Sequence, residues 1–401
     1  MSDAGSLLVI NAGSSRIKFA LYAADLAPRL SGKVEGIGTA PHLSASRSDG
    51  ANLIDRRWPE GGALPIRTLL DYLMDWLEGH LGTERLAAVG HRVTTGGLDH
   101  SEPVMITPEI FERLRALTLL APFHQPFNLE PIESLRRSHP RLPQVACFDT
   151  AFHRTMPQMA ASYALPRRLA GFGARRYGFH GLSYEYIAGR LKELDPAAAA
   201  GRCVVAHLGS GASMCALRAG KSVATTMGFS PLSGLVMGTR PGDLDPGLII
   251  WLIRELGMSV EDVEQMLYRE CGLRGVSGVS GDMRTLLESG SVHAADAVEL
   301  FVYRVATELG ALTAALGGLD ALVFTAGIGE HAPAIRRAVC ERSAWLGIRL
   351  DPRRNANGTG RISSDDSTVR VWAMPTDEER MIATHTAALM RDRDAPDSGE
   401  A

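Results

Sequence analysis

The fold of this chain is decided by residues 7–22, which read LLVINAGSSRIKFALY. Two short apolar runs, 7–10 and 17–22, flank a turn of small residues, and this pattern predicts two antiparallel strands joined by a tight turn. Such a turn directs backbone N–H groups and short hydroxyls into one concavity, which suits an anionic oxygen. For this stretch alone, a phosphate site and a plain hairpin both stay open as interpretations.

The same order of elements recurs in the middle of the chain. Residues 202–208 predict a strand, 209–213 (GSGAS) a turn of small residues, and 214–217 and 222–226 two returning strands. Further strands at 321–324 and 369–374 and a helix from about Pro333 follow. Two halves that each open with a hairpin and continue with alternating strands and helices predict an α/β fold of two duplicated domains around a nucleotide cleft.

Other segments have simpler patterns. Apolar spacing predicts a helix over 65–81 and a buried central helix over 293–316, and Thr107 followed by proline predicts a helix start. Strands are expected at 32–38, 86–93 and 143–148, a surface loop over 39–62, and a frayed tail from Arg391. The triplet Gly220-Lys221-Ser222 resembles the end of a P-loop, but it lies between two strands, so we interpret it as a hairpin turn.

The composition excludes several functional classes. A length of 401 residues predicts two or three domains, and a net charge of −3 gives no general attraction to nucleic acid or to an anionic membrane. No apolar run approaches the length that spans a bilayer. Five scattered cysteines without a C-x-x-C pair predict buried thiols in a reducing compartment, so we expect a cytoplasmic protein.

Polar side chains stand where predicted strands end or loops begin, which is where α/β sheets bind ligands. These side chains are Arg92 in GHRV (90–93), His124 in APFHQP (121–126), Asp149 in FDTAFH (148–153), His180 in RYGFHG (176–181) and Arg240 in MGTRPGD (237–243). Two arginines from different halves suit a carboxylate and a phosphoryl group, because the planar guanidinium fork matches both.

These segments, with SGVSGDMR (277–284), FTAGIGE (324–330) and PTDEE (375–379), resemble the acetate kinase family, in family order along nearly the entire chain. The resemblance implies an actin-like (ribonuclease H-like) fold with domains 1–150 and 151–381, and a C-terminal helix, 382–401, that packs back on the first. It implies reversible phosphorylation of acetate by ATP to acetyl phosphate and ADP, through direct in-line transfer. It also implies a homodimer, with no nucleic-acid or membrane partner.

The resemblance implies a role for each residue that matches a family motif. The expected catalytic residues are Asp149, His180 and Arg240. The expected carboxylate-site residues are Arg92, Thr94, Phe123, His124, Phe179 and Pro231. The expected nucleotide-binding residues are Ser14, Lys18, His207, Leu208, Gly209, Ser210, Gly211, Asp282, Met283, Arg284, Gly327, Ile328, Gly329, Glu330 and His331. The expected metal residues are Asn11 and Glu378, for Mg²⁺ with Mn²⁺ as an alternative.

Elementary chemistry refines two of these roles. Acetic acid is already ionised near neutral pH, so orienting an arginine or the substrate is a more useful task for Asp149 than acting as a base. Thr376-x-x-Glu379 matches a capping box, which would give Glu379 a structural duty and leave Glu378 for the metal. His124 stays open between a pocket residue and a structural hydrogen bonder.

The chain departs from the family pattern at several pocket positions. The replacements are Arg16, Thr94, Phe123, Gln125, Ser210, His331 and Asp377. Phe123 beside a polar Thr94 could narrow the carboxylate site or admit a hydroxylated acid, while Arg16 and Ser210 leave the phosphate-donor affinity open. The alternatives to an acetate kinase are a kinase for propionate, butyrate or a hydroxy acid, and a non-catalytic actin-like nucleotide-binding protein. The last alternative is disfavoured because binding alone would not require the whole set of Arg92, Asp149, His180, Arg240 and Glu378.

Overall fold

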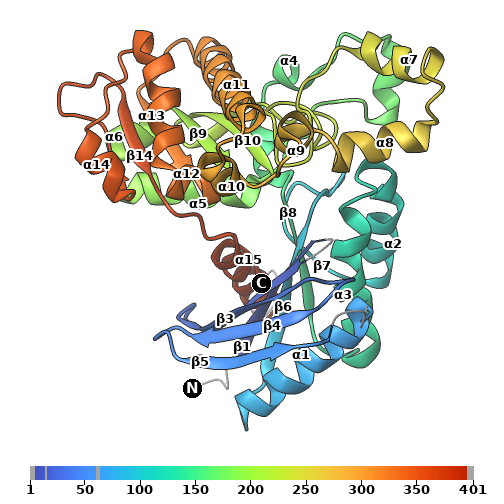
Figure 1. Ribbon diagram of the computed structural model, residues 1–401. Helices are drawn as coiled ribbons and strands as arrows, with labels where there is room; N and C mark the ends of the chain where they lie inside the picture. Colours follow the sequence, from blue (N-terminus) through green and yellow to red (C-terminus); the bar gives the residue numbers. More distant parts are fainter. Residues whose placement is uncertain (1–4, 14–15, 60–63, 395–401) are drawn as a thin grey trace, which may run out of the picture. The chain divides into compact units, whose positions relative to one another are not determined.

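The structure, a computed structural model, describes residues 5–13, 16–59 and 64–394 (Figure 1). The chain divides into two compact units, residues 1–151 with 377–401 (unit 1) and residues 152–376 (unit 2). Each unit is built on one β-sheet. Within the described ranges, none of the helices combines the length and the apolar character that crossing a membrane requires.

Unit 1 has an eight-stranded sheet in the order β5-β4-β3-β2-β1-β6-β8-β7. Its strands are β1 (Ser6–Ala12), β2 (Arg16–Tyr22), β3 (Pro28–Glu35), β4 (His42–Arg47), β5 (Asn52–Arg57), β6 (Leu86–Val93), β7 (Val104–Met105) and β8 (Gln144–Phe148). Strands β1 to β5 form an antiparallel meander, whereas β6 runs parallel to β1 and β8 runs parallel to β6. The predicted first hairpin is therefore confirmed.

Helices cover both faces of this sheet. They are α1 (Ile66–Leu81), α2 (Pro108–Ala116), η1 (Leu117–Leu120), α3 (Gln125–Ser138) and α15 (Glu378–Asp394). Leu8, Ile10 and Val89 pack with the apolar side of α1 in the main core. Neighbouring strand residues point to opposite faces, and Gly90, next to Val89, faces Ile382 and Thr386 of α15. The last helix therefore closes the face of the sheet opposite α1 (Figure 1).

Unit 2 has a six-stranded sheet in the order β11-β10-β9-β12-β14-β13. Its strands are β9 (Arg202–Leu208), β10 (Ala212–Arg218), β11 (Lys221–Thr225), β12 (Ala321–Thr325), β13 (Gly360–Arg361) and β14 (Arg370–Ala373). Its helices are η2 (Ala151–Thr155), α4 (Gln158–Ala161), η3 (Arg167–Phe172), α5 (Gly181–Leu194), α6 (Pro196–Ala200), α7 (Pro246–Arg254), α8 (Val260–Arg269), α9 (Gly272–Ser277), α10 (Met283–Glu288), α11 (Val292–Leu316), α12 (Ala326–His331), α13 (Pro333–Arg342), η4 (Ala344–Leu346) and α14 (Pro352–Asn357).

The two sheets repeat one topology. The order β3-β2-β1-β6-β8-β7 in unit 1 corresponds strand for strand to β11-β10-β9-β12-β14-β13 in unit 2. In both, the first three strands are antiparallel, the next two run parallel to the first, and the edge strand is antiparallel again. The predicted α/β class with a duplicated domain is confirmed.

Three predictions about single segments need correction. The segment 39–62, predicted as a loop, contains β4 and β5, whose polar residues are tolerated because the strands extend the free edge of the sheet. Helix α11 is buried on one face only, through residues such as Phe301 and Val305, while Tyr303 is exposed. Helix α15 continues through Arg391 to Asp394, and the rest of the predicted frayed tail lies outside the described residues.

The close approach of α15 to the sheet requires a glycine at position 90. A Cβ added there would lie 2.3 Å from Thr386 Oγ1 and 2.6 Å from Ile382 Cγ2. We predict that Gly90→Ala lowers the free energy of unfolding of unit 1 by about 1–3 kcal/mol, because the helix must shift to relieve the overlap. Urea unfolding followed by circular dichroism measures this change.

Gly79→Ala is the matched control for that substitution. Gly79 lies in α1, and a Cβ there would meet nothing within 4 Å. Since alanine favours a helix interior over glycine, this variant should gain about 0.5–1 kcal/mol. A Gly90→Ala protein as stable as the wild type would contradict the described docking of α15.

Candidate functional site

In unit 1, a buried ion pair joins the ends of two neighbouring parallel strands. Arg92 lies near the end of β6 and Asp149 directly follows β8, so the strand ends bring the two residues together. Asp149 is fully buried and accepts hydrogen bonds from Arg92 Nε, at 3.1 Å, and from Arg92 Nη2. Burial alone would lower the pKa of Arg92, but the carboxylates of Asp149 and Glu378 outweigh it and raise the pKa. The guanidinium is therefore charged and fixed in orientation.

The predicted capping box at the start of the last helix is wrong. Helix α15 begins at Glu378, and Asp377 caps it by accepting a hydrogen bond from Arg380 N at 2.9 Å. Thr376 Oγ1 donates instead to Ser183 Oγ. Glu379 is thereby released from the structural duty that its spacing from Thr376 suggested.

Both glutamates at the start of α15 contact the first hairpin. Asn11 Nδ2 donates to Glu378 Oε2 at 3.2 Å and to Glu379 Oε1 at 3.0 Å. Lys18, the cross-strand partner of Asn11, places its Nζ 3.7 Å from Glu379 Oε1. The predicted metal residues Asn11 and Glu378 thus lie together, and Glu379 joins them.

This set of donors suits a hard divalent cation. Two carboxylates and an amide lie at one place, and oxygen ligands are what such cations prefer. The described residues hold no group of three or more His, Cys, Asp or Glu side chains arranged to bind a metal. Two carboxylates and one amide would leave most positions around a hard divalent cation to water or to other ligands.

Asn128, which the sequence analysis missed, connects the predicted carboxylate site to the hairpin. Its Oδ1 accepts from Thr94 N at 2.9 Å and from Thr94 Oγ1 at 2.7 Å, and its Nδ2 donates to Ala12 O at 2.6 Å. The hydroxyl proton of Thr94 is therefore used inside the protein and is not offered to a hydroxylated acid. A buried asparagine between Phe127 and Leu129 of a helix was the signal for this anchor.

Two further departures from the family pattern have structural explanations. Gln125 is fully buried and exchanges two hydrogen bonds with the backbone of Thr95, while Phe123 and His124 lie half-buried just before α3. Arg16 faces Glu35 across the strand pair, with Nη1 3.8 Å from Glu35 Oε1. The side chain of Arg16, 53% exposed, therefore lies on the surface of the sheet. Ser14 lies outside the described residues.

In unit 2, the segment before α5 adopts an unusual backbone that presents His180. Both Gly178 (φ 76°) and His180 (φ 58°) are left-handed, and a Cβ on Gly178 would meet the His153 ring at 2.6 Å. His153 Nε2 donates to Phe179 O at 2.9 Å. Burial lowers the pKa of His153 to about 4, and this hydrogen bond offsets only part of the shift. A neutral, buried histidine thus holds the segment that carries Phe179 and His180.

One arginine and two histidines of unit 2 lie close to the turn between β9 and β10. A Cβ added to Gly211 would lie 2.6 Å from Arg240 Nη2 and 3.4 Å from His180 Nε2, so only glycine leaves room for both. Arg240 Nη1 donates to Pro231 O at 2.8 Å. The rings of His180 and His207 stack with centroids 4.2 Å apart. Donors from three segments therefore surround this turn.

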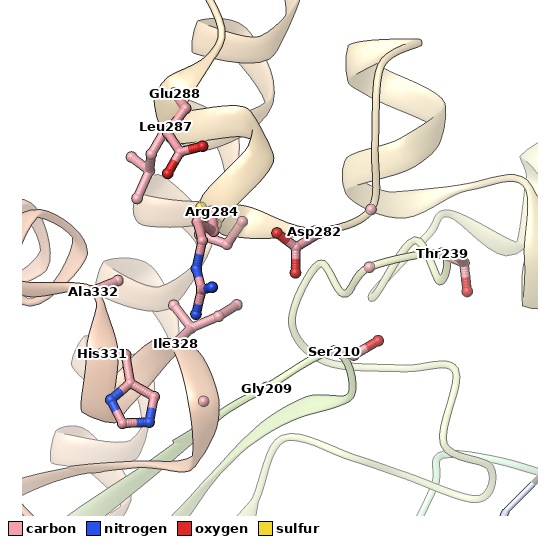
Figure 2. Close-up of a pocket in the computed structure, with 14 residues that line it drawn as sticks. Gly209, Ser210, Thr239, Asp282, Arg284, Leu287, Glu288, Ile328, His331 and Ala332 are labelled. Carbon is pink, nitrogen blue, oxygen red and sulfur yellow. The ribbon is translucent and has the colours of Figure 1, made fainter. Parts of the chain in front are cut away.

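A cavity of about 500 Å³ in unit 2 adjoins the same turn (Figure 2). Eight predicted nucleotide residues line it: Gly209, Ser210, Asp282, Met283, Arg284, Gly327, Ile328 and His331. Lys18, His207, Leu208, Gly211, Gly329 and Glu330 are not in its lining. Gly238, Thr239, Gly281, Leu287, Glu288 and Ala332 line it but were missed by the sequence analysis. Figure 2 shows the segment of Asp282 and Arg284 on the opposite side of the cavity from the turn that begins at Gly209.

A buried arginine supports one wall of the cavity. Arg336 is fully buried in α13 and donates to Gly329 O at 2.8 Å and to Glu330 O at 2.6 Å, the last turn of α12. It also donates to Asn355 Oδ1 at 2.8 Å. Carbonyls in the last turn of α12 are therefore satisfied by a charged donor, which keeps this helix, with Gly327 and Ile328 in its first turn, in place.

Solved structures share nearly the whole of this fold. A propionate kinase from Francisella tularensis is 37% identical, with a TM-score of 0.88 over 95% of this chain and 98% of that chain. An acetate kinase from Porphyromonas gingivalis is 35% identical, with a TM-score of 0.84 over 96% of this chain and 100% of that chain. The fold is that of the acetate and propionate kinases.

Sequence comparison identifies the family. Residues 6–384 match the model of the acetokinase family. An acetate kinase from Rhodopseudomonas palustris is 56% identical over 97% of this chain and 99% of its own length, and one from Nitrobacter hamburgensis is 50% identical over 97% of both. The chain belongs to the acetokinase family, as its motifs predict.

Proposed function

We propose that this chain transfers the γ-phosphoryl group of ATP to acetate, reversibly and by direct in-line transfer, to give acetyl phosphate and ADP. The observation that carries the proposal is the gathering of Arg240, His180 and His207 at the Gly209–Gly211 turn beside the cavity. Phosphoryl transfer is catalysed by positioning and by neutralising charge on the transferred oxygens, and these donors suit that task.

Each polar residue of the site has one proposed task. Arg92 binds the carboxylate of acetate, and Asp149 is a positioning residue that holds the Arg92 fork by accepting two hydrogen bonds. Acetate needs no base, because it is ionised at neutral pH. Arg240 and His180 donate to the transferred phosphoryl group, where preorganised donors are worth most. The residues lining the cavity bind the nucleotide.

We infer Mg²⁺ as the metal, with Mn²⁺ as an alternative, held by Glu378 and Asn11. When bound, it neutralises charge on the phosphates. The two carboxylates already lie together, bridged by the amide nitrogen of Asn11, so the protein contributes two charged oxygen groups at one place. Glu379 pairs with Lys18 and bonds to Asn11, which makes it a positioning residue for the Asn11 amide.

Acetate is the favoured substrate because the curated relatives, which are up to 56% identical to this chain, are named acetate kinases. Propionate is the second candidate, because the propionate kinase from Francisella tularensis has a similar fold and 37% identity. The five cysteines are free thiols, four of them buried, which supports a reducing compartment such as the cytoplasm.

We also infer that the protein is a homodimer through helix α7. None of the residues Pro246–Arg254 is buried, although the helix reads PGLIIWLIR. Leu248, Ile250, Trp251 and Ile253 are all exposed and lie around more than one side of the helix. A helix that is apolar on most sides is normally covered. A second copy of the chain would cover it in the proposed dimer.

Trapping of the acyl phosphate with hydroxylamine tests the activity. With ATP and Mg²⁺, kcat/KM should be highest for acetate and about 10-fold or more lower for propionate, butyrate and glycolate, the order expected of a site that selects acetate by its size. Arg240→Ala should lower kcat by about 10²–10³-fold if it acts in the transition state. Arg304→Ala is the control for this substitution, because Arg304 is exposed, and it should retain full activity. Absence of product with every acid would exclude the kinase, and a preference for propionate would establish the second candidate.

The metal assignment is tested by the Mg²⁺ dependence of the rate. Glu378→Gln should raise the Mg²⁺ concentration for half-maximal rate by about 10-fold or more, because a charged oxygen ligand is lost. Glu379→Gln keeps a hydrogen-bond acceptor for Asn11 and should raise this Mg²⁺ concentration less. Glu35→Gln, which removes a charge paired with Arg16 on the same sheet, should leave it unchanged. An unchanged requirement in Glu378→Gln would contradict the assignment.

The dimer is tested by sedimentation equilibrium. Trp251→Glu should convert the protein to a monomer, because a buried charge at the centre of an apolar interface is costly. Trp345→Glu is the matched control, since Trp345 is exposed in unit 2 but lies outside α7. A dimeric Trp251→Glu protein, or a monomeric wild type, would contradict the proposal.

A further inference from the structure

Two short chains of hydroxyl groups end on the two stacked histidines of unit 2. Ser213 Oγ lies 2.8 Å from His180 Nδ1 and is also hydrogen-bonded to Tyr184 OH. Ser183 Oγ lies 2.8 Å from His207 Nδ1 and accepts a hydrogen bond from Thr376 Oγ1, also at 2.8 Å. In each chain a buried serine therefore connects a second hydroxyl to the Nδ1 atom of a histidine.

The direction of the first chain follows from where each proton can go. Tyr184 is fully buried, and within residues 5–13, 16–59 and 64–394 its hydroxyl has Ser213 Oγ as its one hydrogen-bond partner. Burial raises the pKa of Tyr184, so the hydroxyl keeps its proton. A buried donor without an acceptor is unfavourable, so Tyr184 must donate to Ser213. Ser213 then donates its own hydroxyl hydrogen bond to Nδ1 of His180.

The second chain runs in the same direction. Thr376 Oγ1 is the donor to Ser183 Oγ. Ser183 is fully buried, and among the described residues the acceptor left for its own proton is Nδ1 of His207. Both serines therefore accept one hydrogen bond and donate one. Both histidines accept at Nδ1.

We propose that the chains Tyr184–Ser213–His180 and Thr376–Ser183–His207 hold both imidazoles in the tautomer that carries its proton on Nε2. The Nε2 atoms are the ones near the turn, since a Cβ on Gly211 would lie 3.4 Å from His180 Nε2 and one on Gly209 would lie 3.9 Å from His207 Nε2. Both rings thus present an N–H donor to an anion at the turn. The four hydroxyl residues are positioning residues.

The stacking of the rings favours the same state. Two imidazolium charges at a centroid distance of 4.2 Å would repel each other, whereas two neutral rings do not. A neutral ring can offer either a donor or a lone pair at Nε2, and the hydroxyl chains select the donor. An Nε2 atom that carries a proton cannot attack phosphorus. The assignment therefore deepens the proposed function, on which it rests, because it makes both histidines stabilising groups for direct transfer.

The tautomers are measured by long-range ¹H–¹⁵N correlation spectroscopy of the full-length protein labelled with ¹⁵N-histidine, without substrate. The signals are assigned from His180→Gln and His207→Gln. The proposal expects a proton on Nε2 and none on Nδ1 of both rings in the wild type. A proton on Nδ1 of either ring, in a neutral ring or an imidazolium, overturns it for that ring. This result does not depend on activity, so it is separate from a failure of the proposed function.

Variants of the hydroxyl groups give the kinetic arm. Ser213→Ala should remove the preference for Nε2–H at His180, leave His207 unchanged, and lower kcat by about 10-fold; Ser183→Ala should change His207 alone. Tyr184→Phe, the milder change, should give a mixture of tautomers at His180. Tyr177→Phe is the matched control, since this buried hydroxyl donates to Gly173 O, and it should change neither tautomer nor kcat. A fall in kcat of Ser213→Ala without a change at His180 overturns the positioning role.

Discussion

The contact between the last helix and the first hairpin is the interaction on which unit 1 depends. Asn11 ends β1, and its amide nitrogen bonds to both glutamates that begin α15. The helix can reach this position because Gly90 lets it lie close to β6. The carboxylates that begin α15 also raise the pKa of Arg92, so packing of the helix and charge at the strand ends are coupled. Asn11, Arg92 and the two glutamates, which are distant in the chain, thereby form one polar cluster.

The duplicated topology explains why both units place polar residues at equivalent strand ends. In unit 1 these are Asn11 on β1, Arg92 on β6 and Asp149 after β8. In unit 2, His207 lies at the end of β9, and the backbone after β12 turns through left-handed Ala326 into α12, which lines the cavity. Parallel strands bring their carboxyl ends to one edge of a sheet, and ligands bind at that edge. The repeat thus supplies two polar edges from one architecture.

The family and the fold class could be predicted from the sequence, and both are confirmed. They rest on motifs in family order, on the repeated order of strands and on glycine-rich turns, and each of these is visible along the chain. The capping box failed since Thr-x-x-Glu is a local pattern, while Glu379 satisfies its charge with Lys18 and Asn11 from the first hairpin. Arg336 was missed because an arginine on an amphipathic helix is usually exposed. The serines beside the histidines were missed because their partners, such as Thr376, come from distant segments.

The central claim is direct in-line transfer assisted by histidines that donate from Nε2. The most direct test uses ATP made chiral at the γ-phosphorus with oxygen isotopes, acetate and the wild-type protein, and determines the configuration at phosphorus in acetyl phosphate. The account predicts inversion, because one in-line displacement inverts phosphorus once. Retention would contradict it, since two displacements would require a phosphorylated side chain, such as a phosphohistidine at His180 or His207.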